Sequence, residues 1–344
     1  MSYWDYMRSP ASARLLLDFG LERGMSESQM LAGSKLDLRQ LGDANVEITA
    51  AQELRIGDNL HRLAGRTAWL GMEIGWRYNF SVYGLWGYGL ISSATVGEGV
   101  ALALRYLPLT FAFCDINFQM DKDSVILTFD CPDIGPDLRH FMLERDMVAA
   151  CVLLRELAGP DFHLSGFNLE HRAMNEVPVF NRVKALLGVV PKLGCSKNLI
   201  SFDATYLARK LPQANPTTSA MCEQLCQQLM KSRRVKLATS SSVSHYLNVL
   251  PANTAPSLPE LARMTNVSVR TLKRKLKGEG TSYRELSINA RKGLAAEMLL
   301  DSSASVSDVA EGLGFGDLST FSQAFKRWYG VSPSHFKRRL QHPT

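Results

Sequence analysis

The clearest hydrophobic pattern lies in the last third of the chain, where it predicts a helix, a turn and a second helix. Ser257-Leu-Pro-Glu260 has capping-box spacing at the start of the first helix. Residues 265–267 are predicted as the turn, and Ser268 as the cap of the second helix. This order is typical of a helix-turn-helix unit, with apolar residues on one stripe of the second helix and basic residues on the other. The apolar positions are Val269, Leu272 and Leu276, and the basic positions are Arg270, Lys273, Arg274 and Lys277.

A second unit follows in the same register. Ser305-Val-Ser-Asp308 repeats the capping-box spacing, Gly314-Phe-Gly316 supplies a turn, and Asp317 is the expected cap of the next helix. Apolar side chains again recur at helical spacing, and a second set of residues lies on the outer face. The apolar positions are Phe321, Phe325 and Trp328, and the outer positions are Leu318, Ser319, Ser322, Gln323 and Lys326.

Residues 283–300 connect the two units and have the spacing of one amphipathic helix. Eighteen residues at 1.5 Å each predict a rod of about 27 Å. Successive major-groove faces on one side of B-DNA are about 34 Å apart. The rod therefore predicts that a single chain places two recognition helices in adjacent major grooves.

The first 230 residues mix helical and strand patterns and predict an α+β domain. Helices are expected at 11–23, 100–107 and 138–157; strands are expected at 114–120, 124–131, 162–169 and 199–202, with a hairpin turn at 121–123. The amphipathic segment 221–230 is either a dimerisation helix or the last helix of this domain. Serine- and proline-rich segments at 239–243 and 251–256 are predicted as linkers. The expected domains are therefore 1–234, a linker and first-helix region at 235–256, and 257–344.

Composition adds the location of the charge. The chain has 344 residues and a net charge of +6, which suits about two globular domains. Residues 1–234 carry 24 Lys+Arg and 25 Asp+Glu, a net of −1, and residues 235–344 carry 15 and 8, a net of +7. Apolar content of 46% excludes a disordered or collagenous chain. A basic module behind a neutral one indicates that the C-terminal part binds a polyanion.

The N-terminal sequence lacks the pattern of a signal peptide, and the uncharged run at 78–97 is too polar for a membrane span. The expected location is therefore the cytoplasm. All six cysteines fall in the neutral part, none spaced C-x-x-C, and we expect them to be reduced and mostly buried.

The sequence shows no catalytic constellation, metal site or cofactor motif, so we expect a protein that is not an enzyme. His140 and Glu144 are spaced i,i+4, which favours a surface hydrogen bond over a metal site without a third ligand. An aromatic-rich stretch at 69–86 predicts core packing or the lining of an apolar ligand pocket. The candidates for the pocket are Trp76, Tyr78, Tyr83 and Trp86.

Residues 257–340 resemble the DNA-binding domain of the AraC/XylS family of bacterial transcription regulators. The resemblance rests on GTSYRELSINARKGLAAEMLL and VAEGLGFGDLSTFSQAFKRWYGVSPSHFKRRL. The strings GLWGYGLISSATVGEGVALALRYLPL and SKNLISFDATYLARKLPQANP are similar to the branch with an arabinose-binding-like N-terminal domain. Members of that branch respond to varied small molecules, so the resemblance does not imply a sugar.

The resemblance implies an effector domain followed by an all-α domain with two helix-turn-helix units and a linker helix. It implies double-stranded DNA, a small-molecule effector, RNA polymerase and a second copy of the chain as partners, with activation as the usual outcome. Base contacts are implied for Arg270, Lys273 and Arg274 in the first helix and for Leu318, Ser319, Ser322 and Gln323 in the second. The family often has Arg where this chain has Gln323, and Arg favours guanine whereas Gln favours adenine.

Two alternatives remain open at this point. AraC-like domains are also fused to DNA-repair alkyl transferases, whose chemistry needs a reactive Cys beside a His or a four-Cys zinc site. Neither spacing is present in this sequence. The other alternative is an architectural protein that binds DNA without sequence preference.

Overall fold

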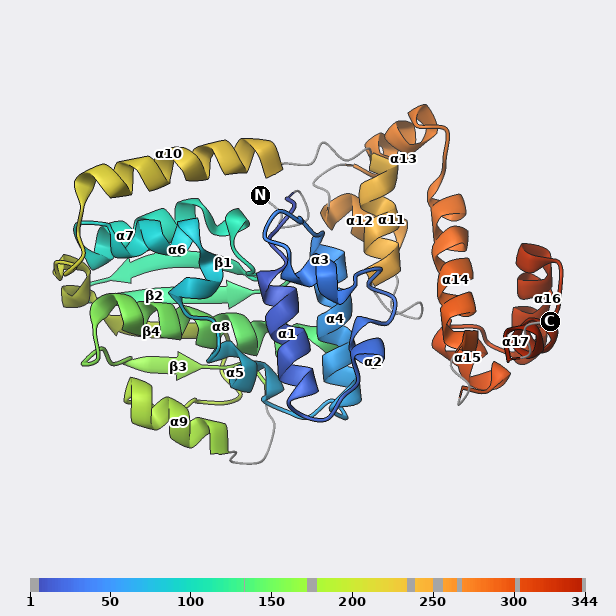
Figure 1. Cartoon of the computed structure of the whole chain (residues 1–344), viewed down its shortest axis with the longest axis horizontal. Helices are drawn as coiled ribbons and strands as arrows, with labels where there is room; N and C mark the ends of the chain where they lie inside the picture. The colour runs from blue at the N-terminus through green and yellow to red at the C-terminus, as the bar shows by residue number, and fades with distance from the viewer. Residues whose placement is uncertain are drawn as a thin grey trace. The chain divides into compact units, whose positions relative to one another are not determined.

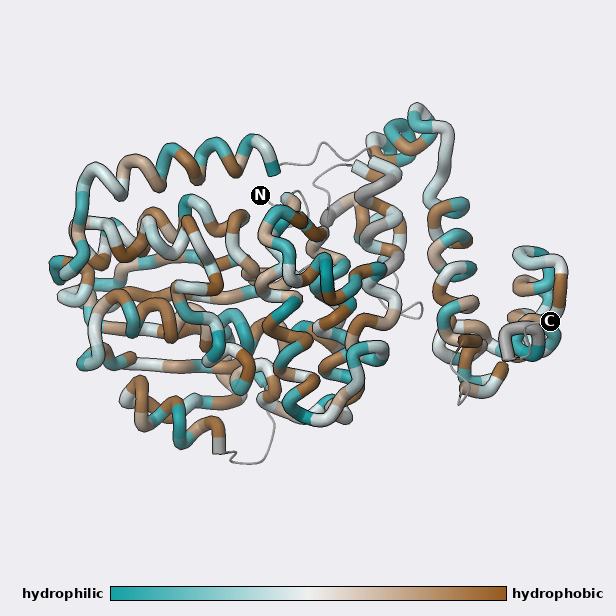
Figure 2. The backbone as a smooth tube through the Cα atoms, viewed as in Figure 1, coloured by the Kyte–Doolittle hydropathy of each residue, from teal (hydrophilic) through white to brown (hydrophobic). Residues whose placement is uncertain are grey.

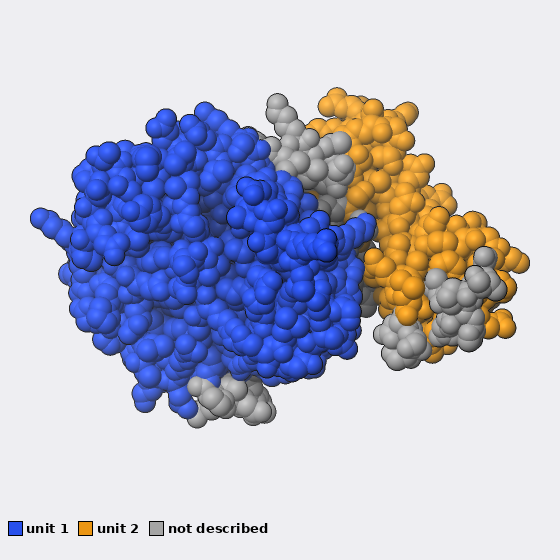
Figure 3. Space-filling view, viewed as in Figure 1, with its two compact units in different colours: residues 1–235 blue, residues 236–344 orange. Residues whose placement is uncertain are grey.

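The chain divides into two compact units, residues 1–235 and 236–344 (Figure 3). The structure is a computed structural model that describes residues 6–132, 134–171, 178–233, 239–249, 256–264, 268–300 and 304–341. The turn expected at 265–267 and most of the linker expected at 251–256 lie outside these residues. Among the helices in the described ranges, none combines the length and the apolar character needed to cross a membrane.

The first unit is an α+β domain, as predicted (Figure 1). Its strands are β1 (Asp115–Asp121), β2 (Ser124–Asp130), β3 (Gly166–Asn168) and β4 (Asn198–Asp203). Its α-helices are α1 (Ala11–Leu21), α2 (Glu27–Leu31), α3 (Leu38–Gly42), α4 (Ala50–Leu63), α5 (Leu70–Gly75), α6 (Leu85–Ile91), α7 (Val96–Arg105), α8 (Pro136–Ala158), α9 (Pro178–Leu187) and α10 (Pro216–Arg233). Its short 3₁₀ helices are η2 (Phe80–Tyr83), η3 (Leu107–Leu109) and η4 (Ala204–Ala208).

The four strands form one antiparallel sheet in the order β1-β2-β4-β3. Alternate residues of β2 and β4 are buried on one face, because side chains in a strand alternate between the two sides. Leu127 of β2 lies opposite Ile200 of β4, and both are buried. The expected hairpin turn is confirmed, since Asp121 pairs with Ser124. A helix instead buries one stripe at a period of 3.6 residues, as α1 does with Ala13, Leu16, Leu17 and Gly20, and Figure 2 shows hydrophobic and hydrophilic residues mixed along the helices.

Helix α8 is the central helix of this unit, and α5 packs closely against it. Two glycines of α5 allow this approach. A Cβ at Gly71 would lie 2.1 Å from the Phe141 carbonyl oxygen, and a Cβ at Gly75 would lie 2.7 Å from the Val148 Cβ. Neither distance is compatible with a side chain, so the glycines fix how tightly the two helices meet.

Four charged side chains are buried together where α1, α4 and α8 converge. Glu53 of α4 accepts hydrogen bonds from Arg8 (2.9 Å), from Arg145 of α8 (3.2 Å) and from Ser12 of α1 (2.5 Å). Asp146 accepts from Arg145 at 2.7 Å and from the backbone amide of Phe113 at 2.7 Å. We call Arg8, Glu53, Arg145 and Asp146 the buried ion network; each is at most 5% exposed. It joins three helices to the segment that enters β1.

The second unit is helical, as predicted. Its helices are α11 (Thr239–Val249), α12 (Leu258–Met264), α13 (Val269–Gly278), α14 (Tyr283–Leu300), α15 (Val306–Gly312), α16 (Leu318–Tyr329) and α17 (Pro333–Gln341). Helix α14 contacts α11 on one side and α15, α16 and α17 on the other (Figure 1). The expected connecting helix has the bounds that the sequence predicted.

The linker expected at 239–243 is wrong, because Thr239 begins helix α11. The Glu279 carboxylate accepts hydrogen bonds from the backbone amides of Thr239 (2.8 Å) and Ser240 (2.6 Å). It therefore satisfies two of the amides that are free at a helix N-terminus. Val243, Tyr246 and Leu247 of the same helix are buried. The polar composition of the first turn concealed a helix whose cap comes from a residue far along the chain.

We expect Glu53→Gln to lower the free energy of unfolding by about 3–5 kcal/mol, because it leaves buried Arg8 and Arg145 short of one negative charge. Urea-induced unfolding followed by tryptophan fluorescence measures the change. Asp18→Asn is the matched control, since the Arg14–Asp18 pair is 42% exposed at both side chains and its loss should cost less than about 1 kcal/mol. Equal small effects of the two variants would contradict the importance of the buried ion network.

Candidate nucleic-acid interface and effector pocket

The outer face of α13 carries the basic side chains that the sequence predicted for DNA. Ser268 caps the helix by accepting a hydrogen bond from the Thr271 amide at 3.1 Å. Leu272 and Leu276 are buried, so the opposite stripe is turned to solvent. The exposed residues on that stripe are Arg270, Lys273, Arg274 and Lys277. The structure thus brings the four basic residues together on one accessible face.

Helix α16 presents a less charged face. Asp317 caps it through the Thr320 amide at 2.7 Å, and buried Phe321 and Phe325 set its orientation. Of the predicted contact residues, four are exposed and Ser322 is half-buried. The exposed four are Leu318, Ser319, Gln323 and Lys326. Leu318 is 45% exposed, which is unusual for a leucine and leaves its side chain available for an apolar contact.

Helix α14 is held in place by two tyrosine hydrogen bonds, one from its own Tyr283 and one from Tyr329 of α16, as well as by packing. At its start, the Tyr283 hydroxyl donates to the Pro256 carbonyl at 3.0 Å. Near its middle, the Lys292 carbonyl accepts a hydrogen bond from the Tyr329 hydroxyl at 2.8 Å. Ala295 and Leu299 are buried in the cluster formed with α15 and α16. These contacts make α14 a spacer between α13 and α16.

The first unit contains a largely apolar pocket between α6, α7, α8 and the β1–β2 hairpin. It encloses about 740 Å³ of space not filled by atoms, part of it open to solvent. Helix α8 supplies one wall through Ala149, Ala150, Leu153, Leu154 and Leu157. The hairpin adds Ile116 and Leu127, and α7 adds Val100, Ala103 and Leu104. A concave, mostly apolar site with few polar groups is typical of small-molecule binding.

The structure places three of the four predicted ligand residues in this pocket. Tyr78, Tyr83 and Trp86 line it, whereas Trp76 does not and stacks on the Arg182 guanidinium at 4.8 Å. The rings of Tyr83 and Trp86 lie 5.0 Å apart. Burial raises the pKa of Tyr78 to about 12 and that of Tyr83 well above its ordinary value, so both hydroxyls are protonated at neutral pH.

Arg145 and Asp146 of the buried ion network form the polar end of the pocket. The Arg145 guanidinium also donates to the Phe111 carbonyl at 2.6 Å, and its neighbouring carboxylates raise its pKa. One Asp146 oxygen accepts from the Phe113 and Cys114 amides, and the other accepts from Arg145. Sequence reasoning missed both residues. The signal available was a run of three charged residues, Glu144, Arg145 and Asp146, with apolar residues on both sides of it in a long helix.

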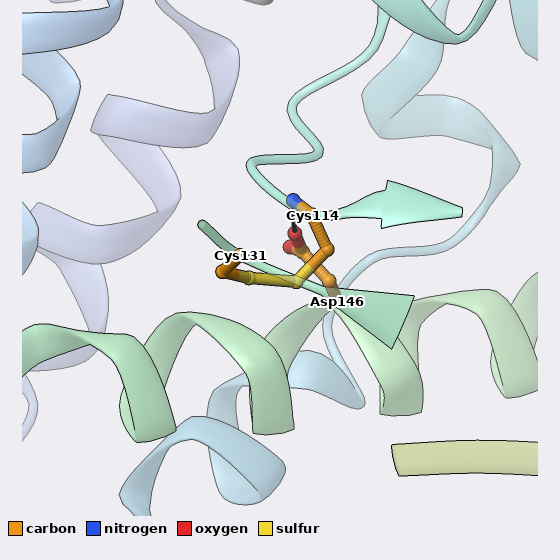
Figure 4. Close-up of side chains that lie close together, drawn as sticks. All are labelled: Cys114, Cys131 and Asp146. Carbon is orange, nitrogen blue, oxygen red and sulfur yellow. Dashed lines mark hydrogen bonds between the residues drawn. A yellow bond between two sulfur atoms is a disulfide. The ribbon is translucent and has the colours of Figure 1, made fainter. Parts of the chain in front are cut away.

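The expectation that all cysteines are reduced is wrong for Cys114 and Cys131, which form a disulfide (Figure 4). The hairpin register explains the pairing. Asp115 lies opposite Asp130, so the next pair outward is Cys114 and Cys131, with Cα atoms 4.3 Å apart. The remaining cysteines are free: Cys151, Cys222 and Cys226 are buried, and Cys195 is half-buried. The turn predicted at 121–123 could have revealed the disulfide, because a hairpin turn at these residues places Cys114 opposite Cys131.

Asp146 lies beside the disulfide, and these three residues are the one group with metal-binding geometry within the described part of the chain. Both sulfurs are bonded to each other, and both Asp146 oxygens accept hydrogen bonds. We therefore assign no metal to them. The expected surface hydrogen bond of His140 and Glu144 is also wrong, since Glu144 is buried and accepts from backbone amides at the start of α5. Its burial raises its pKa to about 8.

The two faces of the second unit and the pocket of the first define a helix-turn-helix transcriptional regulator with an N-terminal effector-binding domain. Comparison with known proteins supports this class. Residues 24–211 match the arabinose-binding domain of AraC transcription regulator, and residues 261–339 match a helix-turn-helix domain. The chain belongs to the AraC family of transcription regulators. This family is not enzymatic, which removes the alkyl transferase alternative.

Individual relatives extend over nearly the whole chain. The uncharacterized HTH-type transcriptional regulator Rv1395 of Mycobacterium tuberculosis is 30% identical over 97% of each chain. The ornithine utilization regulator of Pseudomonas aeruginosa is 28% identical over 95% of each. Among solved structures, the transcriptional regulator CdpR from Pseudomonas aeruginosa matches with a TM-score of 0.49 and 23% identity, covering 95% of this chain and 98% of that one.

Proposed function

We propose that this regulator activates transcription by reading two adjacent major grooves of DNA, one with α13 and one with α16, in response to a small molecule bound in the first unit. The observation that carries the proposal is the pair of capped helix-turn-helix units on one connecting helix. A helix-turn-helix protein with a single unit needs a dimer to contact two half-sites. Here the spacer is part of the chain.

The two helices have different roles in this proposal. Lysine and arginine side chains neutralise phosphates and supply much of the affinity, while contacts to base edges supply specificity. The exposed stripe of α13 carries four basic residues, and the predicted face of α16 carries one, Lys326. Salt sensitivity should therefore come mainly from α13. Leu318, Ser319 and Gln323 are suited to reading base edges through apolar and neutral polar contacts.

The pocket is the proposed effector site. Its polar end belongs to the buried ion network, which joins α1, α4, α8 and the segment that enters β1. A ligand there contacts groups that already hold these elements together. We propose that the ligand shifts a pre-existing equilibrium between arrangements of the two domains or of two subunits.

A homodimer and a contact with RNA polymerase complete the proposal. Met221 and Leu225 of α10 are 54% and 37% exposed and are spaced i,i+4 on one face of that helix. Cys222 and Cys226 face inward on the same helix. This arrangement supports α10 as the last helix of the first domain, with an apolar outer face available to a second copy.

We expect Arg270→Ala to weaken binding to the cognate site by about 1–3 kcal/mol, because it removes a base contact from α13. Fluorescence anisotropy on the cognate duplex and on a scrambled duplex measures the effect. Lys275→Ala is the matched control, since Lys275 is exposed on the same helix but lies off the basic stripe. If Arg270→Ala weakened binding to both duplexes equally, Arg270 would be a phosphate contact and not a base contact.

We expect Gln323→Arg to change the preferred base at one position of the site from adenine to guanine, because Gln pairs bidentately with adenine and Arg with guanine. The discrimination gained should be about 1–3 kcal/mol. Competition between duplexes that differ at single base pairs measures it. Gln323→Ala serves as the control and should lose the adenine preference without gaining another. A preference unchanged at every position in both variants would place Gln323 outside the base-reading set.

A further inference from the structure

The charges around the effector pocket are already balanced by the protein. Arg8 and Arg145 carry two positive charges, and Glu53 and Asp146 carry two negative charges within the same buried ion network. Among the described residues that line the pocket, Arg145 and Asp146 are the only charged ones. A carboxylate or an ammonium group entering the pocket would therefore be an unpaired buried charge, which is costly.

The hydrogen-bonding atoms of the pocket divide into used and unused groups. The Tyr78 hydroxyl bonds to Ser12 at 2.7 Å, and the Thr110 hydroxyl donates to the Leu107 carbonyl at 2.7 Å. Trp86 is 5% exposed, and its buried Nε1 has no hydrogen-bond partner in the described part of the chain. The Tyr83 hydroxyl likewise makes no hydrogen bond with any described residue.

A buried N–H without a partner is rare in folded proteins, and one on a side chain that lines a pocket is available to an acceptor on a bound molecule. The indole Nε1 can only donate, and the Tyr83 phenol, which stays protonated, can donate as well. Both residues line the pocket and their ring centroids lie 5.0 Å apart, so the pocket offers two neutral donors on neighbouring side chains to an acceptor oxygen. The remaining lining of the pocket is aliphatic or aromatic and offers only apolar contact.

We propose that the effector pocket takes a neutral, largely apolar molecule with one acceptor oxygen, such as a ketone or an ester, which Trp86 and Tyr83 hold by hydrogen bonds. The inference rests on the proposed function, because it names the chemical class of the effector for the same pocket. A neutral ligand distinguishes this chain from a sensor of charged metabolites, because the charges of Arg145 and Asp146 are already paired within the protein.

The test is calorimetric titration of the full chain with three compounds of equal chain length: 2-nonanone, nonanoate and nonylamine. We expect 2-nonanone to bind about tenfold or more tightly than either ion at neutral pH. Trp86→Phe should weaken 2-nonanone binding about three- to tenfold, the worth of one hydrogen bond, while retaining the ring. Tyr83→Phe provides a second variant with the same expected loss, on a side chain that is only half-buried.

Trp76→Phe is the matched control. Trp76 also has a buried Nε1 without a partner among the described residues, but it lies outside the pocket lining, so 2-nonanone binding should stay within about twofold. Equal or tighter binding of nonanoate or nonylamine would overturn the inference. So would binding of none of the three compounds, or equal effects of Trp86→Phe and Trp76→Phe.

The same preparations, tested on cognate and scrambled DNA, separate this inference from the proposed function. Sequence-specific DNA binding without 2-nonanone binding would overturn the ligand class alone. Binding of 2-nonanone without sequence-specific DNA binding would contradict the proposed function and leave the ligand class in place.

Discussion

The first unit depends on the burial of four charges that must neutralise each other. Glu53 lies between Arg8 and Arg145, and Asp146 connects Arg145 to the backbone amides of Phe113 and Cys114. Removing any one partner would leave an uncompensated charge in a low-dielectric interior. The network therefore fixes the positions of α1, α4, α8 and the start of β1 relative to one another. Because it also forms the polar end of the pocket, the same constraint that holds the fold together limits what the pocket can bind.

The second unit depends instead on short-range signals. Ser268, Ser305 and Asp317 each cap a helix within three residues, and Leu272, Leu276, Phe321 and Phe325 bury one stripe of each recognition helix. Such features are readable from sequence because the interacting residues are neighbours in the chain. The double helix-turn-helix architecture, the bounds of α14 and the exposed faces of α13 and α16 were all predictable for this reason.

The features that the sequence did not predict depend on residues that are far apart in the chain. The N-terminus of α11 is satisfied by Glu279, some 40 positions away, so a serine-rich segment resembled a linker. Trp76 and Trp86 look alike in sequence, yet only Trp86 lines the pocket, because Trp76 ends α5, which packs on α8, whereas Trp86 lies on α6, which packs on α7 and α10. The Cys114–Cys131 disulfide follows from strand register and not from cysteine spacing. Three of the four residues predicted for the pocket line it, and the charged pair at its polar end was not predicted.

In the proposed function, one chain reads two DNA sequences through two different helices on a fixed spacer. Selection of binding sites from random double-stranded DNA by the full chain tests it most directly. We expect an enriched motif with two dissimilar elements about one helical turn, or roughly 10 base pairs, apart for each bound chain. Enrichment of a single element, or no enrichment over the starting pool, would contradict it.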